Sequence, residues 1–259
     1  MVVPSLSIGA LVGIALSGGF VYWEVGRYAT PQVSVTRFDE RRELFAYTAG
    51  LFVGVPFAIA YVLFGASMAN GALLGALLVL AAFAVGGEVA QWGLVRTRYW
   101  GRGESRPFYV LGYRAAIGGI VALAITAQSL GAATVTLDGT LLALLDAVAV
   151  FALQVAAALL ALRTAPAGGR TGGGPVSAAA LVAGGVFLVG LGPLVGEPAA
   201  FAAGALALGG AVLAYRRLRP LLAEVPPPNA GPPPLTPPES SRYGRIDRPR
   251  VPPGRIRGP

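Results

Sequence analysis

Seven stretches of predominantly apolar residues account for most of this 259-residue chain. An α-helix that crosses the hydrocarbon core of a bilayer needs about 20 such residues. The stretches lie near residues 5–23, 44–65, 70–93, 108–128, 141–162, 176–195 and 199–215. Only Gly196, Glu197 and Pro198 separate the last two, which predicts a tight helical hairpin. We therefore expect an all-α, polytopic integral membrane bundle of seven transmembrane helices.

The composition favours the same class of protein. The chain is 55% hydrophobic and 12% charged, and a soluble domain carries roughly twice that charged fraction. The N-terminal residues MVVPSLSIG contain no positive charge, and no small-residue cleavage motif follows the first apolar stretch. This pattern favours a retained first span over a cleaved signal peptide.

The distribution of arginine predicts the orientation of the spans. All 20 basic residues are arginines, and all except Arg114 lie at the edges of the apolar stretches or between them. They occur in the connections 24–43, 94–107 and 163–175 and in the C-terminal segment, whereas the intervening connections contain none. Because short cytoplasmic loops are enriched in arginine, this alternation predicts seven spans in the cell membrane, with the N-terminus outside and the C-terminus in the cytoplasm.

Three missing residue types limit the chemistry. The chain contains no cysteine, histidine or lysine. These absences exclude thiolate catalysis, haem and zinc sites of the usual kind, and a Schiff-base cofactor. No group of carboxylate, serine or tyrosine residues converges as a catalytic site would. We therefore expect no enzymatic activity, no cofactor and no metal.

Seven spans with an outside N-terminus resemble the plan of the microbial rhodopsins, in topology alone. The resemblance would imply a bundle that holds retinal. Retinal is attached to a lysine of the seventh span in that family, and this chain has none. Retinal-dependent pumping by the usual linkage is therefore excluded.

Small residues spaced by four predict close contacts between helices, because lipid competes for ordinary apolar contacts and association depends on close backbone approach. The spaced sets are Gly9, Gly13 and Ser17; Gly50, Gly54 and Ala58; and Gly71 and Gly75. Pro56 and Pro193 fall inside predicted spans, where proline kinks a helix.

Two ionisable residues lie within neighbouring predicted spans. Glu88 lies late in the third span and Arg114 early in the fourth. At 1.5 Å of rise per residue, both side chains lie on the order of 10 Å from the cytoplasmic end. We expect them to pair, with Gln91 and Tyr113 close enough to extend the network. Two interpretations remain open: a structural link between helices, and a site for an ion, a proton or a polar ligand.

Asp146 and Gln154 form a second candidate site on the fifth span. They are eight residues apart, which suggests a polar stripe along nearly one face. The same residues could instead join helices through hydrogen bonds. Gln128, Ser129 and Thr140 are the expected partners of Asp146, whose carboxyl is either hydrated or protonated.

Arginines of the predicted cytoplasmic surface are candidate contacts for anionic groups. The charged residues 39–43 resemble a solvated interfacial turn. The candidate contacts in the third-to-fourth connection and the C-terminal segment are Arg96, Arg98, Arg102, Arg106, Arg242, Arg245, Arg248, Arg250, Arg255 and Arg257. Anionic lipid headgroups or an acidic cytoplasmic protein suit these arginines better than nucleic acid does.

The chain divides into a seven-helix transmembrane domain, residues 1–219, and a proline- and arginine-rich cytoplasmic tail, residues 220–259, that we expect to be disordered. The sequence favours a non-catalytic scaffold or accessory subunit that recruits partners or anionic lipid through its basic face. The alternative is a small transporter or channel with a polar site around Glu88, Arg114, Asp146 and Gln154. The sequence leaves the oligomeric state open.

Overall fold

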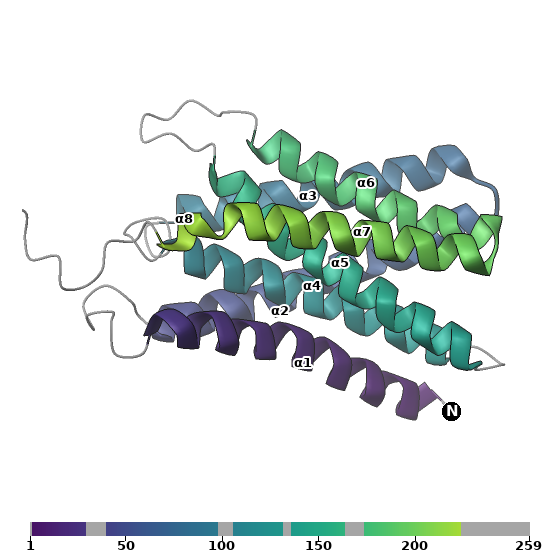
Figure 1. Cartoon of the computed structure of the whole chain (residues 1–259), viewed down its shortest axis with the longest axis horizontal. Helices are drawn as coiled ribbons and strands as arrows, with labels where there is room; N and C mark the ends of the chain where they lie inside the picture. Colours follow the sequence, from purple (N-terminus) through teal and green to yellow (C-terminus); the bar gives the residue numbers. More distant parts are fainter. Residues whose placement is uncertain (1, 30–39, 98–105, 132–135, 164–173, 224–259) are drawn as a thin grey trace, which may run out of the picture. The chain divides into compact units, whose positions relative to one another are not determined.

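The computed structural model describes residues 2–29, 40–97, 106–131, 136–163 and 174–223. Within these ranges the chain is all-helical, and seven helices are long and apolar enough to span a membrane, as predicted. The helices are α1 (Val2–Ala29), α2 (Glu40–Ala69), α3 (Leu73–Arg96), α4 (Arg106–Leu130), α5 (Leu137–Arg163), α6 (Gly174–Val195), α7 (Glu197–Leu218) and the short α8 (Pro220–Ala223) (Figure 1).

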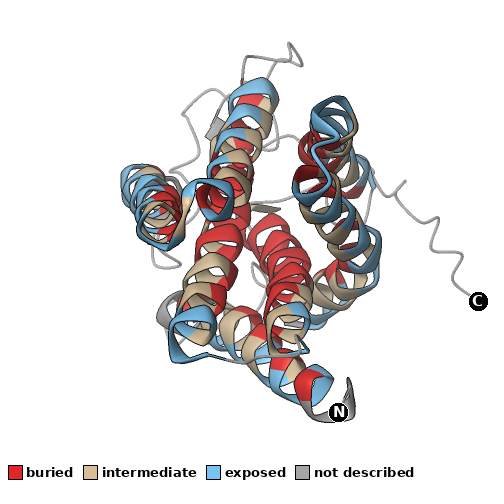
Figure 2. Ribbon diagram, turned by 90° about the vertical axis from the view of Figure 1, so that its right-hand side faces the viewer, coloured by how far each residue is buried: buried red, intermediate tan, exposed pale blue. Residues whose placement is uncertain are grey.

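Helix α4 forms the centre of the bundle. In its most apolar segment 83% of the residues are buried, against 67% in α5 and 22–33% in the other five long helices. It packs against α1, α2 and α5, and α5 in turn packs against α6 and α7. Figure 2 shows the buried residues gathered on the inner helices, while exposed residues cover the outer faces. Large apolar side chains, including Leu11, Phe52 and Leu74, are exposed, which is compatible with a multi-pass membrane protein.

Helix α1 lies against α4 through the predicted small-residue face. A Cβ atom on Gly9 would lie 2.7 Å from the Leu123 carbonyl oxygen, and one on Gly13 would collide with the Gly119 carbonyl oxygen. The Ser17 hydroxyl donates to the Gly13 carbonyl oxygen at 2.8 Å. Gly9 faces Leu123, and the later residue Gly13 faces the earlier residue Gly119. The two helices are therefore antiparallel.

Helix α2 contacts α4 in the same way but runs parallel to it. A Cβ on Gly50 would collide with the Tyr113 carbonyl oxygen, and one on Gly54 would lie 2.8 Å from Ile120 Cβ. Glycine therefore lets two neighbours approach the backbone of α4, as the spacing of small residues predicted.

The spacing prediction was wrong for the pair Gly71 and Gly75. Helix α3 begins at Leu73, so Gly71 lies in the turn after α2, where its φ of +70° favours glycine. A Cβ on Gly75 would meet nothing closer than 3.8 Å. The two glycines therefore do not lie on one face of a helix, because Gly71 is in the turn and Gly75 is in α3.

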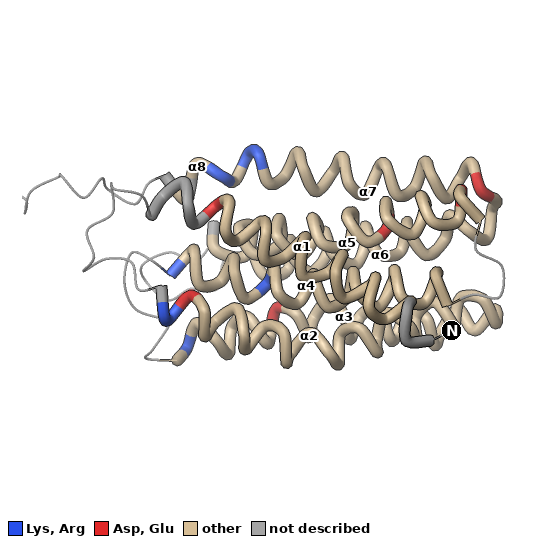
Figure 3. The backbone as a smooth tube through the Cα atoms, turned by 90° about the horizontal axis from the view of Figure 1, so that it is seen from below, with Lys and Arg blue, Asp and Glu red and all other residues tan. Residues whose placement is uncertain are grey.

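Charged residues are distributed unequally between the two ends of the bundle (Figure 3). Asp138 and Glu197 occupy the first turns of α5 and α7 at one end. Apart from Arg114, the arginines of the described part lie at the helix ends that meet at the other end. Those with described side chains are Arg41, Arg42, Arg96, Arg106, Arg216, Arg217 and Arg219.

The packed chain continues past the end of α7. Helix α8 falls within the first residues of the predicted tail, and its Leu222 is fully buried. Residues 224–259, which include the rest of that tail, lie outside the described residues. The disorder expected there stays a prediction.

Candidate functional site

Arg114 is the most prominent polar side chain in the interior. It projects from the central helix α4 and is the largest fully buried side chain among the described residues. Gly87 on α3 provides the space, because a Cβ there would collide with Nη1 of Arg114. A guanidinium in such a position requires acceptors, since burial of an unpaired charge is very costly.

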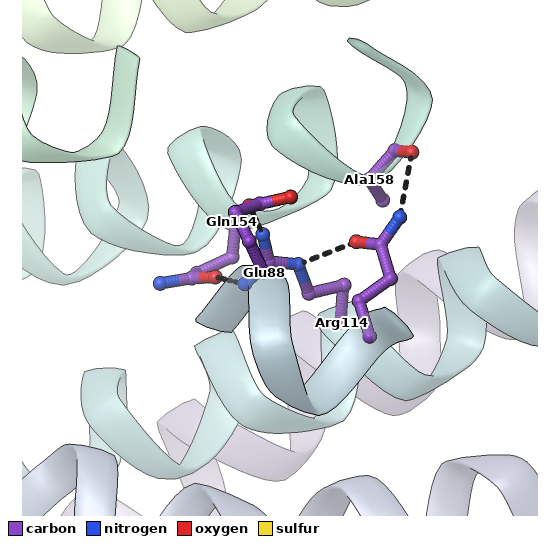
Figure 4. Close-up of polar contacts among 5 residues, drawn as sticks. Glu88, Arg114, Gln154 and Ala158 are labelled. Carbon is purple, nitrogen blue, oxygen red and sulfur yellow. Dashed lines mark hydrogen bonds and ion pairs between the residues drawn. The ribbon is translucent and has the colours of Figure 1, made fainter. Parts of the chain in front are cut away.

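Each nitrogen of the Arg114 guanidinium has an acceptor on a neighbouring helix (Figure 4). Nη2 forms an ion pair with Oε1 of Glu88 on α3. Nε donates to Oε1 of Gln91 on α3, and Nη1 donates to Oε1 of Gln154 on α5, both at 2.9 Å. We refer to Arg114, Glu88, Gln91 and Gln154 as the Arg114 cluster.

The geometry of the Arg114 cluster follows from helix periodicity. Glu88 and Gln91 are three residues apart on α3, so their side chains share a face. The Gln91 amide also donates to the backbone carbonyl oxygen of Ala158 on α5, at 3.4 Å. The cluster therefore ties α3, α4 and α5 together with one positive and one negative charge. Removal of one partner of a buried ion pair typically costs about 3–5 kcal/mol.

The structure brings the predicted pair Glu88 and Arg114 into contact, together with Gln91 and Gln154. Tyr113, the other expected neighbour, is buried, and its backbone carbonyl contacts Gly50 of α2. One polar atom of the cluster is unsatisfied: Nε2 of Gln154 is buried and has no hydrogen-bond partner in the described structure.

Asp146 lies apart from the Arg114 cluster. Its Oδ1 is buried without a hydrogen-bond partner among the described residues, and a Cβ on Gly204 of α7 would lie 2.9 Å from it. None of the expected partners Gln128, Ser129 and Thr140 forms a hydrogen bond with Asp146 in the described part of the chain, and the Thr140 hydroxyl donates to the Thr136 carbonyl oxygen at 2.9 Å. Eight residues of α-helix rotate the side-chain direction by about 80°. Asp146 therefore contacts α7, whereas Gln154 contacts α4.

The sequence analysis missed a buried glutamate at the end of α1. Glu24 is fully buried, and its Oε1 accepts a hydrogen bond from the Tyr215 hydroxyl of α7. Nε of Arg219 lies 3.2 Å from the same oxygen, and the Arg219 guanidinium lies over the Trp23 ring at 5.6 Å. Glu24 follows Ser17 by seven residues, which is the signal that places it on the inner face of α1.

The expectation of a solvated charged turn at residues 39–43 was wrong for Glu43. Its side chain is only 5% exposed, and its carboxyl group contacts α4 at Gly112. Glu43 precedes Gly50 by seven residues and so shares the packed face of α2. Arg41, on another face of the same turn, is exposed as expected.

The described part contains only some of the candidate anionic contacts. Arg96 is exposed, and its guanidinium lies 4.1 Å from the centre of the Trp92 ring. Arg106 is half-buried at the start of α4. Arg98, Arg102 and the six candidate arginines of the tail lie outside the described residues. Among the residues that are described, no group of three or more His, Cys, Asp or Glu side chains could hold a metal ion.

The fold and its buried polar groups define an all-helical protein that is compatible with a multi-pass membrane location. Comparison with protein-family models, curated proteins and solved structures gives no match. The function must therefore be inferred from the residues of this chain.

Proposed function

We propose that this chain is a multi-pass protein of the cell membrane, with its N-terminus outside and its C-terminus in the cytoplasm. It acts as a non-catalytic scaffold or accessory subunit, and its basic end recruits anionic lipid or an acidic protein. The observation that carries this proposal is the gathering of arginines at one end of the bundle (Figure 3). Positive charge is retained on the cytoplasmic side of membranes and attracts their anionic inner surface.

The Arg114 cluster supports a structural use of the polar interior. The Arg114 guanidinium meets an acceptor at each nitrogen, and all these acceptors come from the protein itself. Because each guanidinium nitrogen is bonded to a neighbouring helix, these contacts hold α3, α4 and α5 together. A rigid bundle that presents charged groups at one end suits a scaffold.

Binding to anionic membranes tests the proposed role of the basic end. The full chain, in nanodiscs of neutral lipid, would be mixed with vesicles of phosphatidylcholine or of phosphatidylcholine with phosphatidylserine. We expect binding only to the anionic vesicles, with strong weakening by salt. Deletion of residues 240–259 should reduce this binding. A matched variant that replaces the six arginines Arg242, Arg245, Arg248, Arg250, Arg255 and Arg257 by glutamine should reduce it equally.

Two outcomes would contradict the anionic-lipid arm: binding that is unchanged by both variants, and equal binding to neutral vesicles. Association of the full chain with an acidic protein, lost in the same two variants, would support the partner arm.

The orientation is tested with compartment-specific reporters on the two chain ends. Activity of both reporters in the same compartment would refute it.

A small transporter or channel is the second candidate function, around Glu88, Arg114, Asp146 and Gln154. It is favoured by the enclosed and unpaired atoms Oδ1 of Asp146 and Nε2 of Gln154. Reconstituted vesicles with a potassium diffusion potential and an internal pH dye would report proton flux. Flux that D146N or Q154L abolishes would support this candidate, whereas vesicles as tight as protein-free ones would reject it for protons.

A further inference from the structure

Glu43 differs from the two other buried glutamates of the described part. Glu24 lies beside the Arg219 guanidinium, and Glu88 forms an ion pair with Arg114. Both carboxyl oxygens of Glu43 are buried and have no hydrogen-bond partner within the described ranges. The arginines of α2 and α4 with described side chains are Arg41, Arg42, Arg106 and Arg114, and none of them forms an ion pair with Glu43. Arg114, two residues from Gly112 on α4, is already paired with Glu88.

The surroundings of the Glu43 carboxyl group are close-packed. A Cβ on Gly112 would collide with Oε1 of Glu43, so a larger residue at this position would have to displace the carboxyl group. The next inward-facing residue of α2, Ala46, is completely buried. The carboxyl group therefore lies at the edge of the same α2–α4 contact that Gly50 and Gly54 form deeper in the bundle.

An ionised carboxylate without a cation or a hydrogen-bond donor is very costly in such surroundings, whereas its neutral acid is much less so. Neither the contacts nor the charges around Glu43 supply compensation. We propose that Glu43 is a proton-binding site, and that the proton it holds allows α2 and α4 to pack in contact beside Gly112. Glu43 lies in the first turn of α2, so exchange of the proton takes place with the water at the basic end of the bundle.

The site makes the α2–α4 contact dependent on proton occupancy. With the proton bound, a neutral group occupies the space that Gly112 leaves. Without it, the interface encloses a negative charge that only water or movement of α2 can stabilise. This role is independent of the recruitment of partners, because it concerns a packed interface and not the exposed arginines.

Infrared spectroscopy of the full chain in lipid tests whether the proton is present. At neutral pH the wild type should show the carbonyl band of a protonated carboxylic acid, with a shift in heavy water. Glu43→Gln should remove one such component. Asp146→Asn is the matched control and should leave that component unchanged. A spectrum in which Glu43→Gln removes only a carboxylate band would overturn the proposal.

Thermal unfolding provides a second readout with a matched pair of variants. Glutamine has the shape of the neutral acid, so Glu43→Gln should leave the unfolding midpoint within experimental error of the wild type. Glu88→Gln removes the charge partner of Arg114 and should lower the midpoint by several degrees. If Glu43→Gln lowers the midpoint as much as Glu88→Gln, or prevents folding, Glu43 is ionised and paired, and the proposal fails.

Discussion

Two glutamates approach the central helix from different neighbours. Glu88 of α3 reaches Arg114, and Glu43 of α2 reaches Gly112, two residues earlier on α4. Their exposures are similar, at 9% and 5%. A glycine provides space in both places. Gly87, the neighbour of Glu88 on α3, leaves room for the Arg114 guanidinium, whereas Gly112 on α4 leaves room for the Glu43 carboxyl group itself. Equal burial therefore does not imply an equal role, because the facing group determines what the carboxyl group can do.

The largest expected effect comes from removing the guanidinium. Arg114→Met leaves Glu88 buried without its cation, which should lower the free energy of unfolding by about 3–5 kcal/mol. Chemical unfolding in detergent, followed by tryptophan fluorescence, would measure it. Arg114→Met combined with Glu88→Leu should cost less than the two single changes added together. Additive losses would show that the ion pair does not couple the two residues, and the contrast with Glu43 would disappear.

Added volume at the two glycines gives the next largest effects. Gly87→Ala and Gly112→Ala each place a Cβ against a buried polar group, and overpacking typically costs about 1–3 kcal/mol. Gly93→Ala is the control, because a Cβ there meets nothing within 4 Å. It should be neutral or stabilising, since alanine favours helix. The same unfolding assay applies.

The second glutamate sharpens this prediction. Glu43→Ala should largely remove the penalty of Gly112→Ala, because it removes the group with which the new Cβ collides. It should leave the penalty of Gly87→Ala unchanged. If Gly112→Ala costs the same with and without Glu43, the carboxyl group does not occupy the space beside Gly112.

The sequence predicts the helices and the depth of their charges better than the direction in which side chains face. Runs of apolar residues are sufficient to locate seven helices, and counting residues from the helix ends places Glu88 and Arg114 at one level. Glu24 and Glu43 were missed because an apolar stretch ends at the first charge, while the helix continues beyond it. Only the seven-residue spacing from Ser17 and Gly50 indicates their faces.

Rotation of each helix about its axis depends on tertiary packing, which one sequence does not specify. Asp146 and Gln154 satisfy the spacing for nearly one face, yet the contacts with Gly204 and Arg114 assign them to different neighbours. The same limit applies to Gly71 and Gly75, whose spacing imitates a packing motif across a turn.

A smaller effect is expected at the third glutamate. Tyr215→Phe removes the hydroxyl that donates to Glu24 and leaves the ring against Phe20. Loss of one such hydrogen bond should cost about 1 kcal/mol, less than the loss of Arg114, because the Arg219 guanidinium still faces the carboxylate. Thermal unfolding would measure the change. A loss as large as that of Arg114→Met would mean that Arg219 contributes nothing to the stability of buried Glu24.

The smallest effect is expected at Asp146, which, like Glu43, has no arginine in contact. Asp146→Asn keeps the shape of the side chain beside Gly204 and removes no hydrogen bond from Oδ1, which has none in the described part. The free energy of unfolding should change by about 0.5 kcal/mol or less, the range of substitutions that break no specific interaction. Glu88→Gln, the same chemical change at a paired acid, is the matched comparison. If both amides destabilise equally, Asp146 has a partner of its own, and Glu43 is then the one unpaired acid among Glu24, Glu43, Glu88 and Asp146.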